Sequence, residues 1–497
     1  MKKISLLLLS ACLLVMSGCE KDLDQTPISN PSAPAFYQTA SDFEQALNSV
    51  YSQLRGYPDR ILILSETRSD NIYGVSVQGV RDWDPINNFA STLSINPYIS
   101  DAWNSDYGAV FRANTFLDQL TTNGAVVQSD VRTRYEAEAK FIRAFHYLDL
   151  VRTFGKVPVI EHALLPNEIA KIPRQPVAQA YDLIISDLQF AKDNLPATYT
   201  GSNIGRATAG AAKSLLALVY LTRSGPTYGI EGPGLGTNDY AAAAALLDEV
   251  IASKTYSLQS SYANVFSYTN ENNPEVVFDI QYITGQGATF PGVMVAQAFF
   301  TSLSIPFDSR GIENKPVSND LYNSYASNDV RRSFSTQNGY TNQGVVYDRP
   351  VLKKYVSAAG RGTSGTDWPI NFIVMRYADV LLMRAECALR GNVGGGQAEA
   401  VARVNEVRKR AGQPEVTSIT LPQFMEERRR EFIGEGLRWN DLVRSGLALD
   451  VMNTWIPKED AANNKISRNI NANYLIYPVP QTELSTSPGL YEQNPGY

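Results

Sequence analysis

Apolar residues recur at every third or fourth position along two long parts of the chain, and this spacing predicts α-helices that bury one face. In the first part, a helix is expected to begin at Asp42 with Ser41 as its N-cap, followed by helices over about 101–120 and 130–154. Further stripes run through Tyr181, Ile184, Leu188, Ala191, Leu195, Ala211, Leu215, Leu218, Ala243, Leu247 and Val250. Residues 41–254 are therefore expected to form a helical unit with loop insertions.

The helical spacing fades over residues 255–371, where Asn, Ser, Gly, Thr and Tyr are frequent. Val276, Phe278 and Ile280 alternate with their neighbours, which indicates a short strand. Because this segment is too long for a plain loop, we expect it to fold against the helices as an irregular insertion with a few short strands.

Helical spacing returns at Met375, and residues 372–446 are expected to form the second helical part. Two stripes lie on either side of three consecutive glycines, at Ala378, Leu381, Ala385 and Ala388, and at Ala400, Val404, Val407 and Ala411. They span 376–411, close to the ~34 residues of a tetratricopeptide repeat, although a generic helical hairpin is the alternative. Residues 447–497 are expected to be an irregular segment that packs on the scaffold.

The segment 426–446 combines aromatic and charged residues. Phe432, Glu435, Trp439 and Leu442 fall at intervals of three, four and three, which predicts one shared helical face. The charged residues on or beside it are Arg428, Arg430, Glu431, Glu435, Arg438 and Asp441. Either the helix is amphipathic with a solvated charged side, or the charges pair beneath the aromatics and fix how helices dock. Both interpretations make the segment structural rather than catalytic.

The composition is that of a folded protein, with 497 residues of which 44% are hydrophobic and 19% charged. The net charge of −6 and the lack of a basic run argue against nucleic-acid binding. His146 and His162 have no ligand-like partner four residues on, so neither a metal site nor a cofactor is expected.

The chain begins like a lipoprotein precursor. Lys2 and Lys3 precede an apolar run to Met16, which is too short to span a bilayer but typical of a signal peptide. Small residues then precede Cys19, so we expect residues 1–18 to be removed and Cys19 to carry the lipid, palmitate included. An ordinary signal peptide with a chance Cys is the alternative. No other segment is hydrophobic enough to anchor the chain.

Residues 19–40 are polar and contain Pro27, Pro31 and Pro34, which predicts an extended, lipidated tether. Once the leader is removed, Cys387 is left alone in a predicted helix unless it pairs with Cys19, so no disulfide framework is expected.

Several motifs resemble, in the right order, the SusD/RagB family of outer-membrane nutrient-uptake lipoproteins. The family signature is matched by Glu427-Arg428-Arg429, Glu435-Gly436, Arg438-Trp439, Asp441-Leu442 and Arg444. Further matches are Cys19, 36–51, 103–114, 137–144, Phe154-Gly155, Val157-Pro158, 376–382 and the closing Gln493-Asn494-Pro495-Gly496-Tyr497. The resemblance assigns a structural role to Arg428, Glu435, Arg438, Trp439 and Asp441.

The resemblance implies a mainly α-helical, tetratricopeptide-like scaffold of helical hairpins with an irregular region on one side. It also implies a lipid-anchored protein of a Gram-negative outer membrane, facing the cell surface. Such a protein holds a glycan or another nutrient for a TonB-dependent, SusC-like transporter. The acidic run after Cys19 resembles the export signal of surface lipoproteins.

Three classes of function are weighed. Surface capture of an oligosaccharide or polysaccharide is favoured, with a peptide or another solute as the alternative nutrient. A glycosidase needs two carboxylates across a cleft, and no such pairing, nucleophile elbow, zincin motif or phosphate loop is recognisable. A helical-repeat scaffold that binds only protein accounts for the helices, but it leaves the lipid anchor and the aromatic, polar insertion unexplained.

The ligand residues are sought outside the helical stripes. Sugars stack their C–H faces on aromatic rings, while Asn, Asp and Arg bind their hydroxyls. The candidates are Tyr73, Arg81, Trp83, Tyr282, Tyr340 and Trp368. Trp83 and Trp368 are the main candidates, because Trp103 and Trp439 lie in scaffold motifs.

Overall fold

The computed structural model describes residues 36–76, 79–305, 315–362 and 366–497. The leader, Cys19 and all but the last residues of the predicted tether lie outside the described residues. No helix within the described ranges combines the length and the hydrophobicity needed to cross a membrane.

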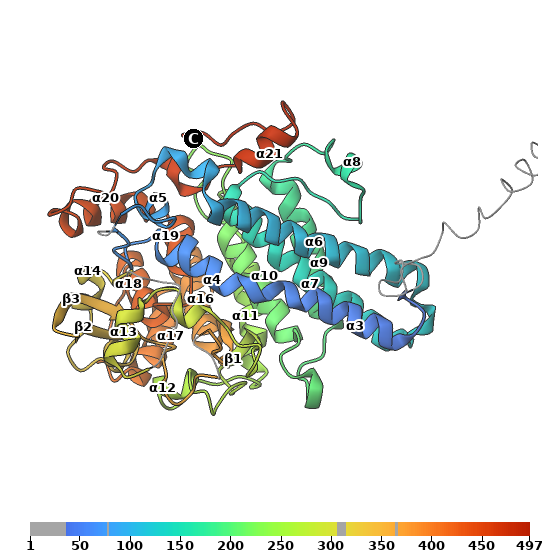
Figure 1. Cartoon of the computed structure of the whole chain (residues 1–497). Coiled ribbons are helices and arrows are strands. Elements are labelled where there is room, and N and C mark those ends of the chain that lie inside the picture. The colour runs from blue at the N-terminus through green and yellow to red at the C-terminus, as the bar shows by residue number, and fades with distance from the viewer. Residues whose placement is uncertain (1–35, 77–78, 306–314, 363–365) are drawn as a thin grey trace, which may run out of the picture.

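A row of helices forms one side of the molecule (Figure 1). The row consists of α3 (Ala40–Tyr51), α6 (Pro97–Asn123), α7 (Ser129–Phe154), α9 (Val177–Asn194), α10 (Ala209–Arg223) and α11 (Tyr240–Ala252). Each helix packs on the next along the chain. Helix α3 begins two residues earlier than predicted, because Thr39 rather than Ser41 is the N-cap and forms a capping box with Asp42.

The array continues into the C-terminal part, where α11 packs on α16 (Tyr377–Gly391) and α16 packs on α17 (Gly396–Arg410). The predicted hairpin of residues 376–411 is confirmed. Asn392 ends α16 in the left-handed conformation. The prediction that the helix starts at Met375 is wrong. Phe372–Arg376 form strand β4, which pairs antiparallel with β1.

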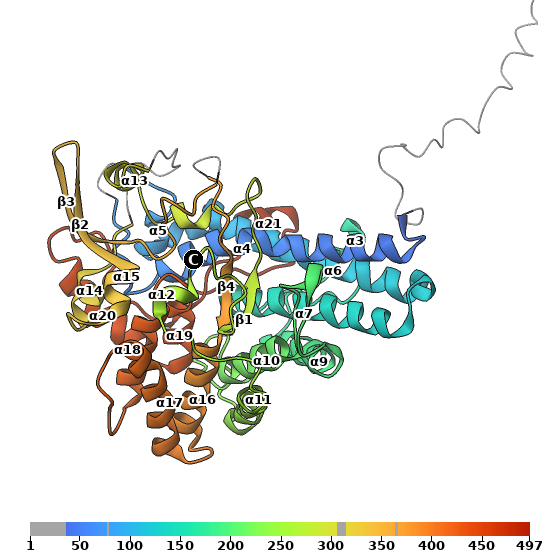
Figure 2. The same ribbon diagram turned by 90° about the horizontal axis from the view of Figure 1, so that it is seen from below.

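The insertion covers one end of the helical array (Figure 2). The predicted strand is confirmed as β1 (Val276–Ile280), and a hairpin of β2 (Thr336–Asn342) and β3 (Val345–Leu352) projects from the surface. The short helices are α12 (Tyr262–Val265), α13 (Gln297–Ser302), α14 (Asn319–Ser324) and α15 (Val330–Ser335). Near the N-terminus, residues 52–66 form short helical turns that include α4 (Tyr57–Ile61).

The charged segment is not one helix. Helix α18 (Leu421–Phe432) ends before a turn, and α19 (Arg438–Ser445) starts after it, so the four residues predicted on one face lie on two helices and a turn. Gly434 and Gly436 make the break with φ values of 75° and 78°, a conformation that suits glycine. Another helix, α20 (Ala448–Glu459), follows at once, so residues 447–497 are not irregular throughout.

The charges of this segment are buried and paired, so the interpretation of a solvated charged side is wrong. Arg438 holds Asp70 with two 2.8 Å hydrogen bonds, and Arg428 binds Asp441 at 2.8 Å. Arg376 forms a two-bond pair with Glu435 at 2.8 and 2.9 Å. Buried charges need such partners, and here the partners belong to different elements. The signature therefore fastens the N-terminal segment, the insertion and the hairpin to one another.

Burial and the neighbouring charges shift the pKa values of these paired residues. Burial alone would raise the pKa of Glu431, but Arg410, Arg376 and Arg331 lower it to about 2. Burial lowers the pKa of Lys354 to about 8 against the opposing effect of Glu435.

Candidate functional site

Trp83 lies at the start of the short helix α5 (Asp84–Asn87) and is half-buried. Its loop is shaped by Asp84, whose carboxylate accepts hydrogen bonds from the backbone N–H groups of Ser76 (2.9 Å) and Arg81 (3.1 Å). A carboxylate that binds its own loop in this way fixes the backbone on both sides of it. Trp83 and the half-buried Arg81 are therefore presented by an ordered turn.

Lys315 of the insertion contacts Trp83. Its ammonium lies 3.9 Å from the centroid of the Trp83 ring and donates a 2.6 Å hydrogen bond to the carbonyl of Val293. A cation over an indole face is worth about 0.5–2 kcal/mol. The contact covers part of the ring and places a positive charge beside the exposed remainder. We call Arg81, Trp83, Asp84 and Lys315 the Trp83 surface.

The same loop borders a hollow of about 610 Å³. Its lining residues are Val75, Ser76, Gly79, Val80, Asp84, Pro85, Asn88, Ala90, Asn463 and Lys465. Val80 is 88% exposed, so an apolar side chain stands in the solvent at the edge of this hollow. The volume lies within the range of about 300–1,000 Å³ that is common for small-molecule sites.

Three predicted ligand residues hold the fold together instead of facing solvent. Trp368 has 0% exposed surface and packs on Phe300 with ring centroids 5.8 Å apart, so the prediction that it displays its face is wrong. The hydroxyl of Tyr73 donates to Asp460 at 2.7 Å, and that of Tyr282 donates to the carbonyl of Arg55 at 2.6 Å. Buried tyrosines of this kind satisfy backbone and carboxylate groups.

Tyr340 lies in the β2–β3 hairpin and is 8% exposed. Its ring stacks on Tyr347 across the hairpin, with centroids 4.4 Å apart and an interplanar angle of 6°. Tyr347 is half-buried and was not predicted, although it lies in the predicted insertion. Lys315 was also missed, because only the folded chain brings it to Trp83, 232 positions away. The sequence around Lys315 gives no signal of that contact.

Among the described residues, no cluster of three or more His, Cys, Asp or Glu side chains is arranged to hold a metal ion. The buried acids and bases that we find belong to the core. His146 of α7 lies 2.8 Å from Asp106 of α6, and burial lowers the pKa of His146 to about 3. Burial also raises the pKa of Asp106 to about 6, against the effect of Arg60.

Known proteins share both the sequence and the fold. The chain is 28% identical to a SusD-like protein of Bacteroides ovatus over 468 residues, which are 89% of this chain and 82% of that protein. Surface glycan-binding protein A from Bacteroides fluxus matches with a TM-score of 0.80 and 25% identity, over 92% of this chain and 100% of that chain. The protein of the same name from Bacteroides thetaiotaomicron, in complex with laminarihexaose, matches with a TM-score of 0.76, 25% identity and the same coverage.

Two family models together match most of the chain. The model described as "Starch-binding associating with outer membrane" matches residues 23–221. The model described as "SusD family" matches residues 249–497, which are half of the chain and include the buried signature. The resemblance read from the motifs is thereby confirmed, and this chain belongs to the SusD family.

Proposed function

We propose that this protein binds an oligosaccharide or polysaccharide at the Trp83 surface and delivers it to a SusC-like, TonB-dependent transporter. The observation that carries the proposal is the half-buried Trp83 ring beside Lys315, next to Asp84, which binds the backbone of Ser76 and Arg81 and borders a hollow. The half-buried indole offers a sugar an apolar ring surface, while Arg81 and Asp84 lie close enough in sequence to bind its hydroxyls. The glycan-binding proteins with this fold support the same ligand class.

We further propose that the protein is anchored at the surface of the outer membrane through lipid on Cys19, after loss of residues 1–18. The short apolar leader that ends in small residues before Cys19 supports this arrangement. The family description, which names association with the outer membrane, supports the compartment. A lipid anchor would leave the Trp83 surface free to meet both a glycan and a transporter.

The proposed activity is binding and delivery without a chemical step. The solved relatives are named for glycan binding. Incubating the protein with the glycans it binds and following their chain length checks this, and shortened products would contradict it.

The binding proposal is tested by a screen over polysaccharides and their oligosaccharides, followed by Trp83→Ala. Aromatic stacking worth about 0.5–1.5 kcal/mol predicts that affinity falls by about twofold to tenfold. Phe111→Ala is a matched control, because Phe111 is 49% exposed on α6. It should leave affinity unchanged.

Equal affinity of wild-type protein and a stable Trp83→Ala variant would refute the site. If no glycan binds, the alternative of a peptide or another solute gains support, and the screen is extended to peptides.

A further inference from the structure

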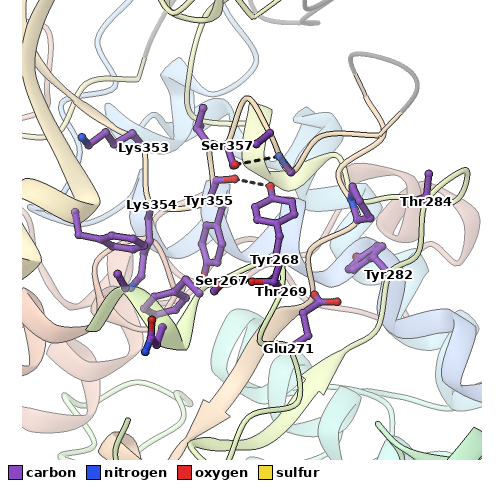
Figure 3. A pocket seen from close by; sticks show the side chains of 18 of the residues that line it. Ser267, Tyr268, Thr269, Glu271, Tyr282, Thr284, Lys353, Lys354, Tyr355 and Ser357 are labelled. Atoms are coloured by element: carbon purple, nitrogen blue, oxygen red, sulfur yellow. Dashed lines mark hydrogen bonds between the residues drawn. The ribbon is translucent and has the colours of Figure 1, made fainter. Parts of the chain in front are cut away.

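A second and larger hollow lies away from the Trp83 surface, between α12, residues 267–271, the segment 282–284 and the segment 353–360 (Figure 3). Its volume is about 980 Å³, and it shares none of its described lining residues with the Trp83 surface or the adjacent hollow. A space of this size is at the upper end of the range common for small-molecule sites. We call it the Tyr268 pocket, after the residue at its centre.

Tyr268 is held in place from two sides. Its hydroxyl donates a 2.8 Å hydrogen bond to the carbonyl of Tyr355. Its ring lies against Gly360, where an added Cβ would come within 2.5 Å of the ring carbons. Gly360 is positioned in turn by a 3.0 Å hydrogen bond from its N–H to the hydroxyl of Ser357. The half-buried ring is therefore ordered without any ligand, which lowers the entropy cost of binding.

Aromatic rings surround Tyr268. Figure 3 shows it between Tyr355 on one side and Tyr282 on the other. Phe266 and Phe334 also line the pocket and stack with centroids 5.9 Å apart at an interplanar angle of 28°. Tyr282, Tyr355 and Phe266 are buried, whereas Tyr268 and Phe334 are half-buried. The pocket thus offers two partly exposed rings for contact with the C–H faces of sugars.

Polar groups lie around these rings. Thr269 and Thr284 are exposed, Ser267 and Ser357 are half-buried, and all four line the pocket. Glu271 lies below Tyr268 in Figure 3 and accepts a 2.6 Å hydrogen bond from the backbone N–H of Asn371, which orients its carboxylate. Hydroxyls and a fixed carboxylate supply both donors and acceptors for a polyhydroxylated ligand.

The charge of the pocket does not favour an ion. Lys354 is buried below it and is neutralised by Glu435, with a second hydrogen bond of 3.0 Å to the carbonyl of Ile433. The remaining charged lining residues are Lys353 and Glu271, one of each sign. A ligand with many hydroxyls, apolar faces and no net charge fits these walls best.

We propose that the Tyr268 pocket is a second binding site, which takes a short neutral oligosaccharide while the Trp83 surface binds its own segment of glycan. The ligand class rests on the proposed function, but the position of the pocket and its aromatic and polar walls do not. Two separate sites on one protein would raise the apparent affinity for a long polysaccharide through effective concentration.

The test is calorimetric titration of the full-length mature protein with laminarihexaose and a panel of other neutral hexasaccharides. Wild-type protein should show two sites, and Trp83→Ala should keep the one in the Tyr268 pocket. Tyr268→Ala should weaken that site about fivefold or more. Tyr268→Phe is the matched control, because it keeps the ring and loses only a hydroxyl that already binds Tyr355.

Thr284→Trp is a second variant in case Tyr268→Ala misfolds, since Thr284 is exposed at the pocket and a large side chain there should block entry. Unchanged binding in both Tyr268→Ala and Thr284→Trp, with a single site lost in Trp83→Ala, would overturn the second site and keep the proposed function. If Tyr268→Ala alone abolishes binding and Trp83→Ala has no effect, the pocket is a glycan site but the assignment of the Trp83 surface fails. Absence of binding to every hexasaccharide would overturn both.

Discussion

Trp83 and Trp439 stand in similar sequences, each within two residues of an Arg and an Asp, yet one is half-buried and the other is buried. Trp83 is half-buried in a surface loop, whereas Trp439 is 2% exposed and its ring packs on Phe89 at 5.8 Å. Arg68 also lies 5.4 Å from the Trp439 ring centroid. The difference places Trp439 in the core and agrees with the ligand contact that we propose for Trp83.

Trp439→Ala is expected to lower the free energy of unfolding by about 3–5 kcal/mol, because a large side chain is lost from a packed core. Thermal unfolding measures the loss, and glycan affinity below the melting temperature should stay at the wild-type value. Trp83→Ala should weaken glycan binding and lower the free energy of unfolding less, by about 0.5–2 kcal/mol from the lost contact with Lys315. A Trp439→Ala variant with an unchanged melting temperature and weaker glycan binding would show that this residue belongs to the site.

Asp279 in β1 should make stability depend on pH. Burial raises its pKa to about 7, against the hydrogen bonds from Gln281 and Asn371, while its ordinary value is 3.8. The folded state therefore holds a proton that the unfolded state has lost between pH 4 and 7. Its contribution to stability is present below pH 4 and is lost as pH rises to 7, by about 1.4 kcal/mol per pH unit at most.

Asp279→Asn removes this titration. The unfolding free energy of the variant should rise relative to that of wild type between pH 4 and 7, with no further relative change at higher pH. Denaturant titrations at one-unit pH steps measure the difference. Parallel profiles of the two proteins would contradict the raised pKa.

At the scale of elements, helices with regular apolar spacing were predictable, because one face of each packs on its neighbour. Helices α6, α7, α16 and α17 all lie where the stripes indicate. The break of segment 426–446 into two helices was not predicted. Its apolar spacing is helical throughout, but Gly434 and Gly436 turn the chain. The spacing of apolar residues in this segment cannot show that Ile61, which is distant in sequence, packs closely on Gly436.

The site was less predictable than the helices. Trp83 and Trp368 were both predicted as ligand residues because they lie in polar segments. Trp83 is half-buried, but Trp368 is fully buried. Its isolated bridge to Ala288 and its contact with Phe300 are tertiary, so nothing in the flanking sequence distinguishes it. The paired charges were foreseen only as one of two interpretations, because their partners lie in other parts of the chain.

The contact of Gly436, in the turn between α18 and α19, with Ile61 can be tested against Gly412, which follows α17. Gly436 and Gly412 both have left-handed backbones, with φ of 78° and 70°. An added Cβ at Gly436 would lie 2.7 Å from Cγ1 of Ile61, whereas at Gly412 nothing lies within 4 Å. Gly412→Ala should cost about 1–2 kcal/mol from backbone strain alone, and Gly436→Ala should cost more. Urea unfolding measures both, and equal losses would exclude a role for the contact with Ile61.

The whole molecule combines a helical array with an insertion at one end, and we propose that lipid on Cys19 anchors it to a membrane. The described residues contain no helix suited to crossing one. On the proposal that lipid on Cys19 is the anchor, Cys19→Ala should move the protein from the membrane fraction to the soluble fraction. Cys387→Ala is the matched control, because Cys387 is a free, buried thiol in α16. Mass spectrometry of the membrane fraction should find lipid on Cys19, and an intact leader there would contradict the proposal.

The pairing of Arg438 with Asp70 spans 368 positions, and Gly436 donates its N–H to Glu66 across 370. Closer to the end of the chain, the hydroxyl of Tyr477 donates to the carbonyl of Leu64 at 2.7 Å. During synthesis from the N-terminus, the carboxylates of Asp70 and Glu66 stay hydrated until the last fifth of the chain has been made. Contacts so distant in sequence slow folding. A chain cut after α17 should accordingly stay open to protease around residues 62–71, however well its helical hairpins form.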